Sequence, residues 1–428
     1  MLSINNFNEL SFLVYGLGLS GKSTIKFFKK NNIKNYKVWD DKIKNLYSSN
    51  RSKNLEKTFK EVDFIVLSPG ISLKKSKNKK KLVKYKHKII TDLDLVFLLN
   101  KFFKTIVVTG TNGKSTTCKI LHHLLKKNNF KVQLGGNIGT PILDLDIKSE
   151  DYLIIEASSF QLSHSKFICP DYGVLLNISN DHLDWHGNIH HYIDSKFKLF
   201  KFQKKQQFAI VNKNLKNQYK LKNLSGTLVI PSIKKYKQIK NKIKNSYLNS
   251  DINDENMTNI FELSKLLKIT KKSFIKSLKS FVGLPHRYEI FLKKKNCTFI
   301  NDSKATSFQA TKFALANTKD IFWIVGGLPK KNDKIDLKNI KKNIVQAYII
   351  GKNIKFFKTQ LKKRIKFKVV WNIKNSVNQV LKDIKVLKKE KNTILFSPAS
   401  ASYDQFPNFE KRGDKFKALS KIYARKFI

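Results

Sequence analysis

Cysteine is scarce in this 428-residue chain, which contains only Cys118, Cys169 and Cys297. Three thiols cannot build a disulfide framework, and their spacing matches no metal-binding pattern. No apolar run approaches the roughly 18 residues that cross a bilayer. The segment from Met1 to Leu10 lacks the charged and apolar parts of a signal peptide. The sequence therefore predicts a protein of the reducing cytoplasm with no membrane span.

Acidic residues are also few: 31 Asp and Glu stand against 85 Lys and Arg, which gives a formal net charge of +54. Such an excess suits nucleic acid or a membrane surface. The lysines, however, are spread over the whole chain with abundant Asn, Ile and Phe, as in a protein encoded by AT-rich DNA. Because no zinc-finger spacing and no RNP-like aromatic motif occurs, we expect no specific nucleic-acid partner. A basic surface would also suit anionic substrates.

Strand-like apolar runs alternate with helix-like segments along almost the whole chain. This alternation predicts an α/β fold with parallel sheets, and the length allows about two to four domains. The pattern separates into three blocks: one up to about residue 92, one from the apolar run 105–108, and one that opens at 283–287. The lysine- and asparagine-rich region 213–250 predicts surface loops and strands.

Residues 109–116 (TGTNGKST) follow an apolar run and precede an amphipathic stretch. Glycines let backbone N–H groups surround phosphates, and a helix N-terminus adds partial positive charge. Lys114 is placed to neutralise phosphate oxygens, and the Ser115 hydroxyl to bind Mg²⁺. The segment therefore predicts a triphosphate site.

A second loop, residues 16–23 (GLGLSGKS), fits the strict triphosphate-loop pattern G-x-x-x-x-G-K-[ST]. The loop 109–116 does not fit it, because Val108 occupies the position of the first glycine. The loop 16–23 also fits the dinucleotide-type G-x-G-x-x-G pattern, and a later apolar strand ends in Asp40 and Asp41. We interpret 16–21 as a diphosphate site for a nucleotide-linked substrate and 109–116 as the ATP site. A tight structural turn is the alternative for 16–21.

Two acidic or mixed clusters follow predicted strands. Glu156 stands at the end of the strand 152–155, where a carboxylate beside a phosphate loop is placed to hold Mg²⁺. His182 lies among acids after the strand 173–176 and suggests a metal or phosphate role. An exposed strand-end acid is the alternative for Glu156, and Lys196 on sequence alone is one solvated lysine among many.

Two segments near the C-terminus combine hydroxyl groups with charged residues: 301–306 (NDSKAT) and 397–406 (SPASASYDQF). The second follows a strand and precedes a probable helix start, which suits a carboxylate ligand. Either segment alone could be a capping loop, and together they predict a substrate site.

These motifs resemble the Mur ligase family. They occur in family order over essentially the whole chain, at residues 16–21, 109–116, 136–139, 156–162, 177–184, 284–289, 301–306 and 397–414. The last two resemble the branch that adds D-glutamate. The resemblance implies three domains: a Rossmann-like UDP-substrate domain (1–92), a central P-loop ATPase-type domain with a parallel sheet (93–283), and a C-terminal Rossmann-like amino-acid domain (284–428).

The resemblance also implies the reaction. It is ligation of D-glutamate to UDP-N-acetylmuramoyl-L-alanine through an acyl phosphate, driven by ATP with ADP as product, as a cytoplasmic step of peptidoglycan precursor synthesis. A monomer that uses two Mg²⁺ ions is expected. The alternatives are a sibling Mur ligase or a folylpolyglutamate synthase, and, from the charge alone, a nucleic-acid-binding protein.

Roles for individual residues follow from the same resemblance. Catalysis is expected of Lys114, His182 and Lys196, with Lys196 carbamylated. The metal ligands are expected to be Ser115, Glu156, His182 and the carbamate of Lys196. The ATP site is expected to comprise Gly110, Thr111, Asn112, Gly113, Lys114, Ser115, Thr116, Asn253, Asn256, Arg287 and Asp302. The UDP-substrate is expected at Leu19, Ser20, Asp40, Ser68 and Asn137. D-glutamate is expected at Lys304, Thr306, Lys330 (or Lys331 in its place), Ser402 and Phe409.

Overall fold

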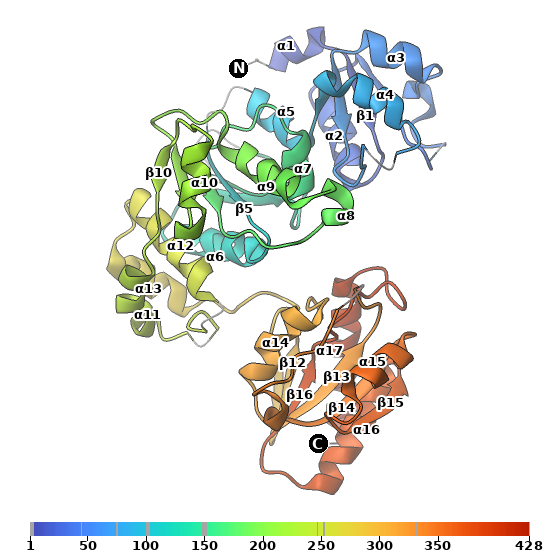
Figure 1. Cartoon of the computed structure of the whole chain (residues 1–428), viewed down its shortest axis with the longest axis vertical. Helices are drawn as coiled ribbons and strands as arrows, with labels where there is room; N and C mark the ends of the chain where they lie inside the picture. Colours follow the sequence, from blue (N-terminus) through green and yellow to red (C-terminus); the bar gives the residue numbers. More distant parts are fainter. Residues whose placement is uncertain are drawn as a thin grey trace. The chain divides into compact units, whose positions relative to one another are not determined.

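The computed structural model describes residues 4–43, 45–73, 76–99, 103–147, 152–245, 247–250, 253–330 and 333–427. The chain forms two compact units, Met1–Phe281 and Val282–Ile428 (Figure 1). The described part holds three sheets with helices packed against them, which confirms the predicted α/β class. Two sheets lie in the first unit and one in the second. The domain boundaries near residues 92 and 283 stay predictions.

The first sheet consists of parallel strands in the order β2-β1-β3-β4. Its short apolar runs are buried because helices cover them, as expected for a parallel sheet. The strands are β1 (Phe12–Tyr15), β2 (Tyr36–Trp39), β3 (Phe64–Leu67) and β4 (Ile89–Ile90), and the helices are α1 (Ile4–Glu9), α2 (Leu19–Lys30), α3 (Leu55–Glu61), α4 (Lys79–Lys84) and α5 (Asp92–Leu98).

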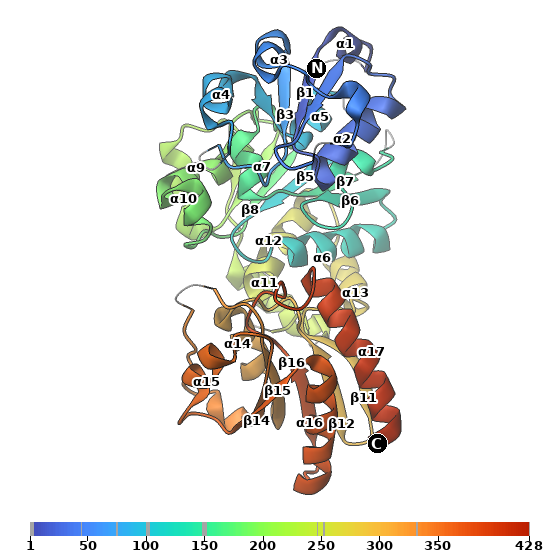
Figure 2. The ribbon, with the colours of Figure 1, turned by 90° about the vertical axis from the view of Figure 1, so that its right-hand side faces the viewer.

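The central sheet is also parallel, in the order β10-β9-β8-β5-β7-β6. Helix α6 packs on β5, β6 and β7, and Figure 2 shows it beside these strands. The strands are β5 (Lys104–Thr109), β6 (Val132–Gly136), β7 (Tyr152–Glu156), β8 (Tyr172–Leu175), β9 (Phe208–Val211) and β10 (Thr227–Val229). The helices are α6 (Lys114–Lys127), α7 (Ser159–His164), α8 (Leu183–His186), α9 (Ile189–Phe197), α10 (Lys216–Leu221), α11 (Ile233–Lys240), α12 (Asp254–Leu266) and α13 (Lys271–Lys279).

The region 213–250 differs from its prediction as loops and strands, because it contains the helices α10 and α11 as well as β10. In α11 only Tyr236 and Ile239 are buried, and the other positions are mostly lysine. Two apolar positions three residues apart are a weak helical signal in the sequence, and the helix depends on tertiary packing.

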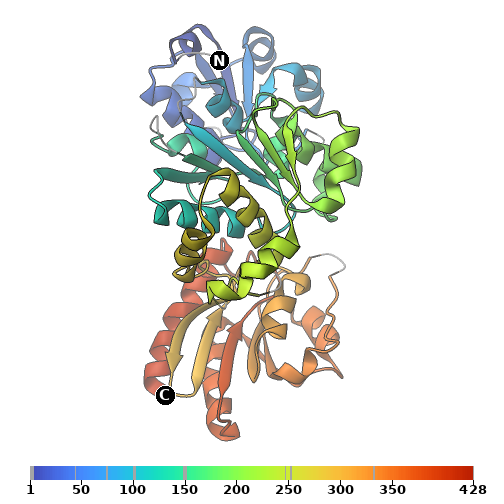
Figure 3. The same cartoon turned by 90° about the vertical axis from the view of Figure 1, so that its left-hand side faces the viewer.

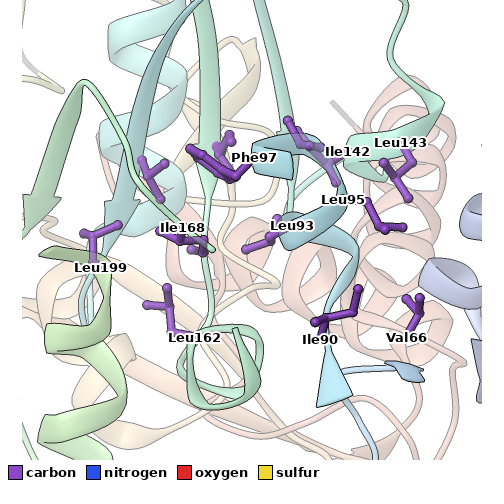
Figure 4. Packing of buried hydrophobic residues seen from close by; sticks show 14 of the residues in the cluster. Val66, Ile90, Leu93, Leu95, Phe97, Ile142, Leu143, Leu162, Ile168 and Leu199 are labelled. Carbon is purple, nitrogen blue, oxygen red and sulfur yellow. The ribbon is translucent and has the colours of Figure 1, made fainter. Parts of the chain in front are cut away.

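Helix α5 connects the first two sheets through a shared apolar core (Figure 4). Leu93 and Phe97 of this helix pack among residues of the central domain such as Leu162 and Ile168. Asp94 on the same turn is buried, and its carboxylate accepts hydrogen bonds from the Ser165 hydroxyl and from the N–H groups of residues 166 and 167. The first two sheets are therefore joined by apolar packing and by a saturated buried carboxylate.

The second unit holds a mixed sheet in the order β11-β12-β16-β13-β14-β15, in which only β11 runs antiparallel to its neighbour among the described strands. The strands are β11 (Glu289–Lys294), β12 (Cys297–Asn301), β13 (Ile321–Gly326), β14 (Ile344–Ile350), β15 (Phe367–Trp371) and β16 (Asn392–Phe396), and the helices are α14 (Phe308–Ala316), α15 (Ile354–Leu361), α16 (Ile373–Leu387) and α17 (Phe409–Phe427). Separate apolar cores cover its two faces, with α16 and α17 on one and α14 and α15 on the other (Figures 2 and 3).

The turn after β1 is held by close backbone packing at Gly21. A Cβ at this residue would lie 1.9 Å from the carbonyl oxygen of Gly16, which itself has φ +100°. The Gly16 oxygen belongs to the backbone and not to a flexible side chain, so any residue larger than glycine at position 21 must move the backbone. The third glycine of this loop therefore serves the approach of α2 to β1.

We expect Gly21→Ala to lower the free energy of unfolding by about 2–3 kcal/mol, because the added methyl overlaps a fixed carbonyl. Gly18→Ala is the matched control, since a Cβ at Gly18 would meet nothing within 4 Å. Thermal and urea unfolding of both variants measure the difference. Equal stability of the two variants would contradict this account.

Candidate nucleotide and substrate sites

The carboxyl ends of neighbouring parallel strands gather the predicted residues at one edge of the central sheet. Val108 of β5 pairs with Glu156 of β7, and Gly136 of β6 pairs with the same Glu156. On the other side of β5, Thr109 pairs with Leu175 of β8. The loop after β5 thus lies between Glu156 and the segment that follows β8. Open α/β sheets bind ligands at this edge.

The loop 110–116 has the strand–loop–helix form expected of a triphosphate site. Helix α6 begins at Lys114, and Gly113 before it has φ +84°. A Cβ at Gly113 would lie 2.1 Å from Oδ1 of Asn256, so this position requires glycine. The Nζ of Lys114 donates to the carbonyl oxygens of Gly110 (2.8 Å) and Thr111 (2.9 Å). The loop presents backbone N–H groups and an ammonium group at a helix N-terminus.

Buried polar side chains surround this loop. Ser115 and Thr116 are buried in the first turn of α6. Asn253 and Asn256 are also buried, and Nδ2 of Asn256 donates to Oδ1 of Asn253 at 3.3 Å. The structure thus places Asn256, which contacts Asn253, against Gly113, the residue directly before α6.

Asn177, which follows β8, holds the tip of the loop. Its Oδ1 accepts from the N–H of Asn112 (2.8 Å), and its carbonyl oxygen accepts from the N–H of Thr111 (2.9 Å). The Thr111 hydroxyl lies 2.9 Å from the hydroxyl of Tyr192 on α9. The loop backbone is therefore fixed from the segments after β8, a role that the sequence motif 177–184 did not reveal.

Lys196, which looked in the sequence like another solvated lysine, is buried and only 1% exposed. Its Nζ donates to the Gly110 carbonyl at 2.8 Å, the same oxygen that accepts from Lys114. Burial, and to a lesser extent the nearby charge of Lys114, lower the pKa of Lys196 to about 6, although the charge of Asp181 acts to raise it. The side chain is therefore mainly a neutral amine at pH 7, next to a cation.

Glu156 has one carboxylate oxygen bonded and one unused. Its Oε1 accepts from Nδ2 of Asn137 at 2.8 Å. Its Oε2 is buried and has no hydrogen-bond partner among the described residues. A buried carboxylate oxygen without a partner is costly unless a cation binds it. No three His, Cys, Asp or Glu side chains cluster as a metal site in the described part of the chain. Mg²⁺ sites in nucleotide-binding proteins commonly use one or two carboxylates together with phosphates and water.

His182 has left-handed backbone geometry, with φ +52°, at the start of α8. Its Nε2 lies 3.5 Å from Oδ2 of Asp181, and its ring packs against Phe160 at a centroid distance of 4.7 Å. The side chain is about half exposed. It stands near the ligand edge and keeps surface available to solvent or ligand.

In the first sheet, the Asp40 carboxylate binds backbone N–H groups of the loops that follow β1 and β2. Its carboxylate accepts from the N–H groups of Leu17 (2.7 Å), Lys42 (2.8 Å) and Ile43 (2.9 Å). Partial burial raises the pKa of Asp40, but these N–H groups lower it to a net value below its usual one. Asp40 thus fixes the turn that precedes α2, in addition to any ligand contact.

The other residues predicted for the UDP-substrate lie around the same turn. Leu19 is 82% exposed, and the Ser68 hydroxyl donates to the Gly16 carbonyl at 2.8 Å. Ser20 interacts with the buried carboxyl of Asp92, which also accepts from Gln161 of the central domain. Sequence reasoning missed Asp92, which lies in no recognised motif.

In the second unit, Asp302 follows β12 and is buried. Its carboxylate accepts from the Ser397 hydroxyl (2.6 Å) and from the N–H of Tyr288 (3.1 Å). Burial raises the pKa of Asp302 to about 7. The positive charge of the Arg287 guanidinium acts in the opposite direction and lowers the pKa of Asp302.

The residues predicted to bind D-glutamate lie on the loops after β12, β13 and β16 and, for Phe409, at the start of α17. Lys304 lies over the Phe409 ring, with its Nζ 4.9 Å from the centroid. Ser402 is buried and Thr306 is partly buried, whereas Lys330 is exposed. Lys331 falls outside the described residues.

Sequence reasoning missed Arg412, which is only 2% exposed. Its guanidinium donates to the hydroxyl (3.1 Å) and carbonyl (2.7 Å) of Ser303. A third nitrogen, Nη1, is buried without a hydrogen-bond partner in the described part of the chain. Burial lowers the pKa of this guanidinium to about 10. Its place in the motif 397–414 was the available signal.

Among the described helices, none is both long and apolar enough to cross a membrane.

Comparison with known proteins adds independent findings. Residues 108–276 match the family described as "Mur ligase middle domain". Over 97% of both chains, the protein is 32% identical to "UDP-N-acetylmuramoylalanine--D-glutamate ligase" of Wolbachia sp. subsp. Brugia malayi. It is also 32% identical to the proteins of the same name from Rickettsia prowazekii, over 98% of this chain and 99% of the relative, and Aquifex aeolicus, over 97% and 99%.

Solved structures share the fold at low identity. The MurF ligase of Thermotoga maritima in complex with ADP aligns over 98% of this chain and 99% of its own, with a TM-score of 0.56 and 17% identity. The UDP-N-acetylmuramate-alanine ligase MurC of the same organism aligns over 97% and 100%, with a TM-score of 0.56 and 14% identity. These likenesses support the architecture alone.

The buried amine of Lys196 generates a prediction about stability and pH. Its pKa is about 6 in the folded protein and about 10.5 when unfolded. As the pH falls from 10 to 6, the unfolded chain binds a proton at this residue before the folded chain does, which destabilises the fold. We expect Lys196→Met to remove this loss, so that its stability advantage over the natural protein grows by about 1–3 kcal/mol between pH 9 and pH 7.

Urea unfolding in buffers free of carbon dioxide measures this effect, with Lys126→Met, at an exposed lysine of α6, as the control. A pH-independent difference between Lys196→Met and the natural protein would show that the amine is not buried in its neutral form.

Proposed function

The chain belongs to the Mur ligase family, among its UDP-N-acetylmuramoylalanine–D-glutamate ligases, and we propose that it joins D-glutamate to UDP-N-acetylmuramoyl-L-alanine with ATP as the energy source. The observation that carries the proposal is the meeting of Lys114 and Lys196 on one loop carbonyl, beside the strand that ends in Glu156. The full-length similarity to relatives of that name supports the choice of substrates. The product is a peptidoglycan precursor.

The reaction activates a carboxylate that would otherwise be a poor electrophile. The L-alanyl carboxylate attacks the γ-phosphorus of ATP, so that an acyl–oxygen–phosphorus bond forms and ADP leaves. The D-glutamate amine then attacks the acyl carbon to give a tetrahedral intermediate. This intermediate loses a proton and expels phosphate to leave the new amide. Negative charge develops on phosphoryl and tetrahedral oxygens, and fixed donors and cations stabilise it.

Lys114 supplies the cation of the triphosphate loop. Its ammonium group donates to two loop carbonyls. We expect it to turn toward the β- and γ-phosphates when ATP binds, while the loop N–H groups from Gly110 to Thr116 surround them. Asn253 and Asn256 are proposed to support the adenine side of the same loop.

The residues present fit Mg²⁺. The unpaired buried Oε2 of Glu156 is a ligand of the type that this ion prefers, and Ser115 lies in the first turn of the adjacent α6. We propose that Glu156 and Ser115 hold one ion, and that His182 with carbamylated Lys196 holds a second. When bound, the ions neutralise charge on the phosphate oxygens.

Carbamylation of Lys196 follows from its neutral state. A neutral amine attacks carbon dioxide, which forms a nitrogen–carbon bond, and the ammonium-type proton is released to leave a carbamate anion. Burial that lowers the pKa of Lys196 to about 6 supplies the neutral amine at pH 7. The anion would then attract Lys114, where a second ammonium group would repel it.

The remaining roles are proposed by region. Residues 1–92 bind the UDP-substrate through Leu19, Ser20, Asp40 and Ser68, together with Asn137 of the central domain (93–283). Residues 284–428 bind D-glutamate through Lys304, Thr306, Lys330, Ser402 and Phe409. We further propose that the protein acts as a monomer in the cytoplasm.

The deciding experiment measures ADP formation with UDP-N-acetylmuramoyl-L-alanine while candidate amines are varied. We expect stimulation by D-glutamate and not by L-amino acids or D-alanyl-D-alanine. Lys114→Ala should abolish ADP formation while binding of the UDP-substrate remains, because the substrate is bound mainly elsewhere. Lys126→Ala on the exposed face of α6 is the matched control. Stimulation by another amine would identify a sibling ligase instead.

Lys196→Ala should lose most of its activity, since the carbamate ligand disappears. Short carboxylates such as formate or acetate should restore part of the rate by occupying the space of the carbamate. With ¹³C-labelled bicarbonate, the natural protein should show a carbamate carbon signal that Lys196→Ala lacks. Natural activity in Lys196→Ala, without added carboxylate, would refute the metal role of this residue.

A further inference from the structure

The first turn of α12 carries a carboxylate that the reaction described above does not use. Oε2 of Glu255 accepts from Nδ2 of Asn177 at 2.8 Å, and Oε1 accepts from Nδ2 of Asn212. Burial raises the pKa of Glu255, while the two amide hydrogen bonds lower it. Both oxygens of this partly buried carboxylate are thus committed to two asparagine side chains from other segments of the central domain.

The first of these asparagines leads directly to the triphosphate loop. Besides its bond to Glu255, the Asn177 side chain accepts from the N–H of Asn112 (2.8 Å) and donates to the carbonyl of Asn112 (3.3 Å). Both Nδ2 hydrogens of the Asn177 amide group are thus used, and its Oδ1 accepts one hydrogen bond. Because its two Nδ2 hydrogens point to Glu255 and to the loop carbonyl, its Oδ1 has to face the Asn112 N–H. Glu255 thereby sets the orientation in which Asn177 holds the loop.

The next residue of α12 makes a second connection to the same loop. Oδ1 of Asn256 stands where a Cβ at Gly113 would come within 2.1 Å. One helical turn thus touches the loop at Gly113 and, through Asn177, at Asn112. The carbonyl of Glu255 and Oδ1 of Asn212 both accept from Nδ2 of Asn259, which ties the carboxylate's helix to its second partner.

The chemistry of residue 255 is specific to a carboxylate. Two amide donors converge on it, and a carboxylate can accept from both. Glutamine could accept from one and would direct an N–H at the other. A negative charge close to a triphosphate site works against anion binding. A carboxylate at position 255 is therefore unsuited to binding phosphates. Its hydrogen bond to Asn177 indicates instead that it orients the side chain that holds the loop.

We propose that Glu255 is a positioning residue that fixes the Asn112 peptide of the triphosphate loop through Asn177. The inference rests on the proposed function, because it takes residues 110–116 as the ATP loop. It adds to that function a residue from α12 that reaches the loop through another side chain and sets how well the loop fits ATP.

The experiment compares Glu255→Gln, Asn212→Asp and the double variant that carries both. Each single change places like groups face to face, two N–H donors in the first and two carboxylates in the second. The double variant restores a donor–acceptor pair between positions 255 and 212 and leaves an acceptor for Asn177. Asn212 also donates to the Leu176 carbonyl, a bond that is lost in both Asn212→Asp and the double variant, so these two variants form the matched comparison. Glu262→Gln is the control, since Glu262 lies on the same helix and pairs only locally with Lys265 at 2.6 Å.

We expect each single variant to raise the KM for ATP about 10-fold, equivalent to about 1.4 kcal/mol, with the KM for D-glutamate changed less than about twofold. The double variant should recover part of the ATP affinity that Asn212→Asp loses, because both lack the donor to Leu176 and differ only in the pair between positions 255 and 212. Glu262→Gln should match the natural protein. An unchanged KM for ATP in both single variants would overturn the proposal, as would an equal rise in the KM values of all substrates or a double variant no better than Asn212→Asp.

Direct binding separates this inference from the proposed function. Calorimetric titration with ADP and Mg²⁺ needs no ligation, so it tests the loop even if D-glutamate proves not to be the amine. We expect the affinity for ADP to fall in the variants whose KM for ATP rises. Because the two single variants break the pair from opposite sides, either one that folds suffices, and thermal unfolding of each checks that it does.

Discussion

Two lysine side chains that share one carbonyl oxygen define the centre of this protein. Lys114 and Lys196 both donate to Gly110, and their proximity together with burial keeps Lys196 neutral. Two ammonium groups at such a distance in a buried place would repel each other strongly. The pair is therefore held as one ammonium group and one amine whose pKa is lowered, both bound to the same loop carbonyl. The loop that carries this carbonyl lies between Glu156 of β7 and the segment that follows β8.

The conformation of the loop 110–116 depends on hydrogen bonds from neighbouring segments as much as on its own glycines. Gly113 gives the backbone geometry that begins α6, but Asn177 holds the N–H groups of Thr111 and Asn112 in place. Small polar side chains suit this task because each amide can accept and donate at once. A loop held this way loses little freedom when it binds phosphates, which favours preorganised stabilisation of charge.

The two glycine-rich loops of the chain show how structure separates similar patterns. The loop at 16–21 matches the strict triphosphate pattern in the sequence, yet its Gly21 packs on the Gly16 carbonyl and its turn is fixed by the Asp40 carboxylate. These contacts belong to a Rossmann-like turn. The loop at 110–116 has Val108 in place of the first glycine but lies between Glu156 and Asn177, at the carboxyl edge of the central sheet. Neighbours in the sheet thus distinguish the loops better than glycine spacing does.

The sequence by itself determined the α/β class, the strands that carry the site and the family, because apolar periodicity and glycine–lysine motifs are local properties. It also placed Glu156 and His182 at strand ends. The burial of Lys196 could not be read in this way, since one lysine among many has no local mark that separates solvent from interior. The same holds for Glu255, Asp92 and Arg412, whose partners lie far along the chain. Only the tertiary structure decided these roles, because desolvation and hydrogen-bond partnership are set by what packs against a side chain and not by its sequence neighbours.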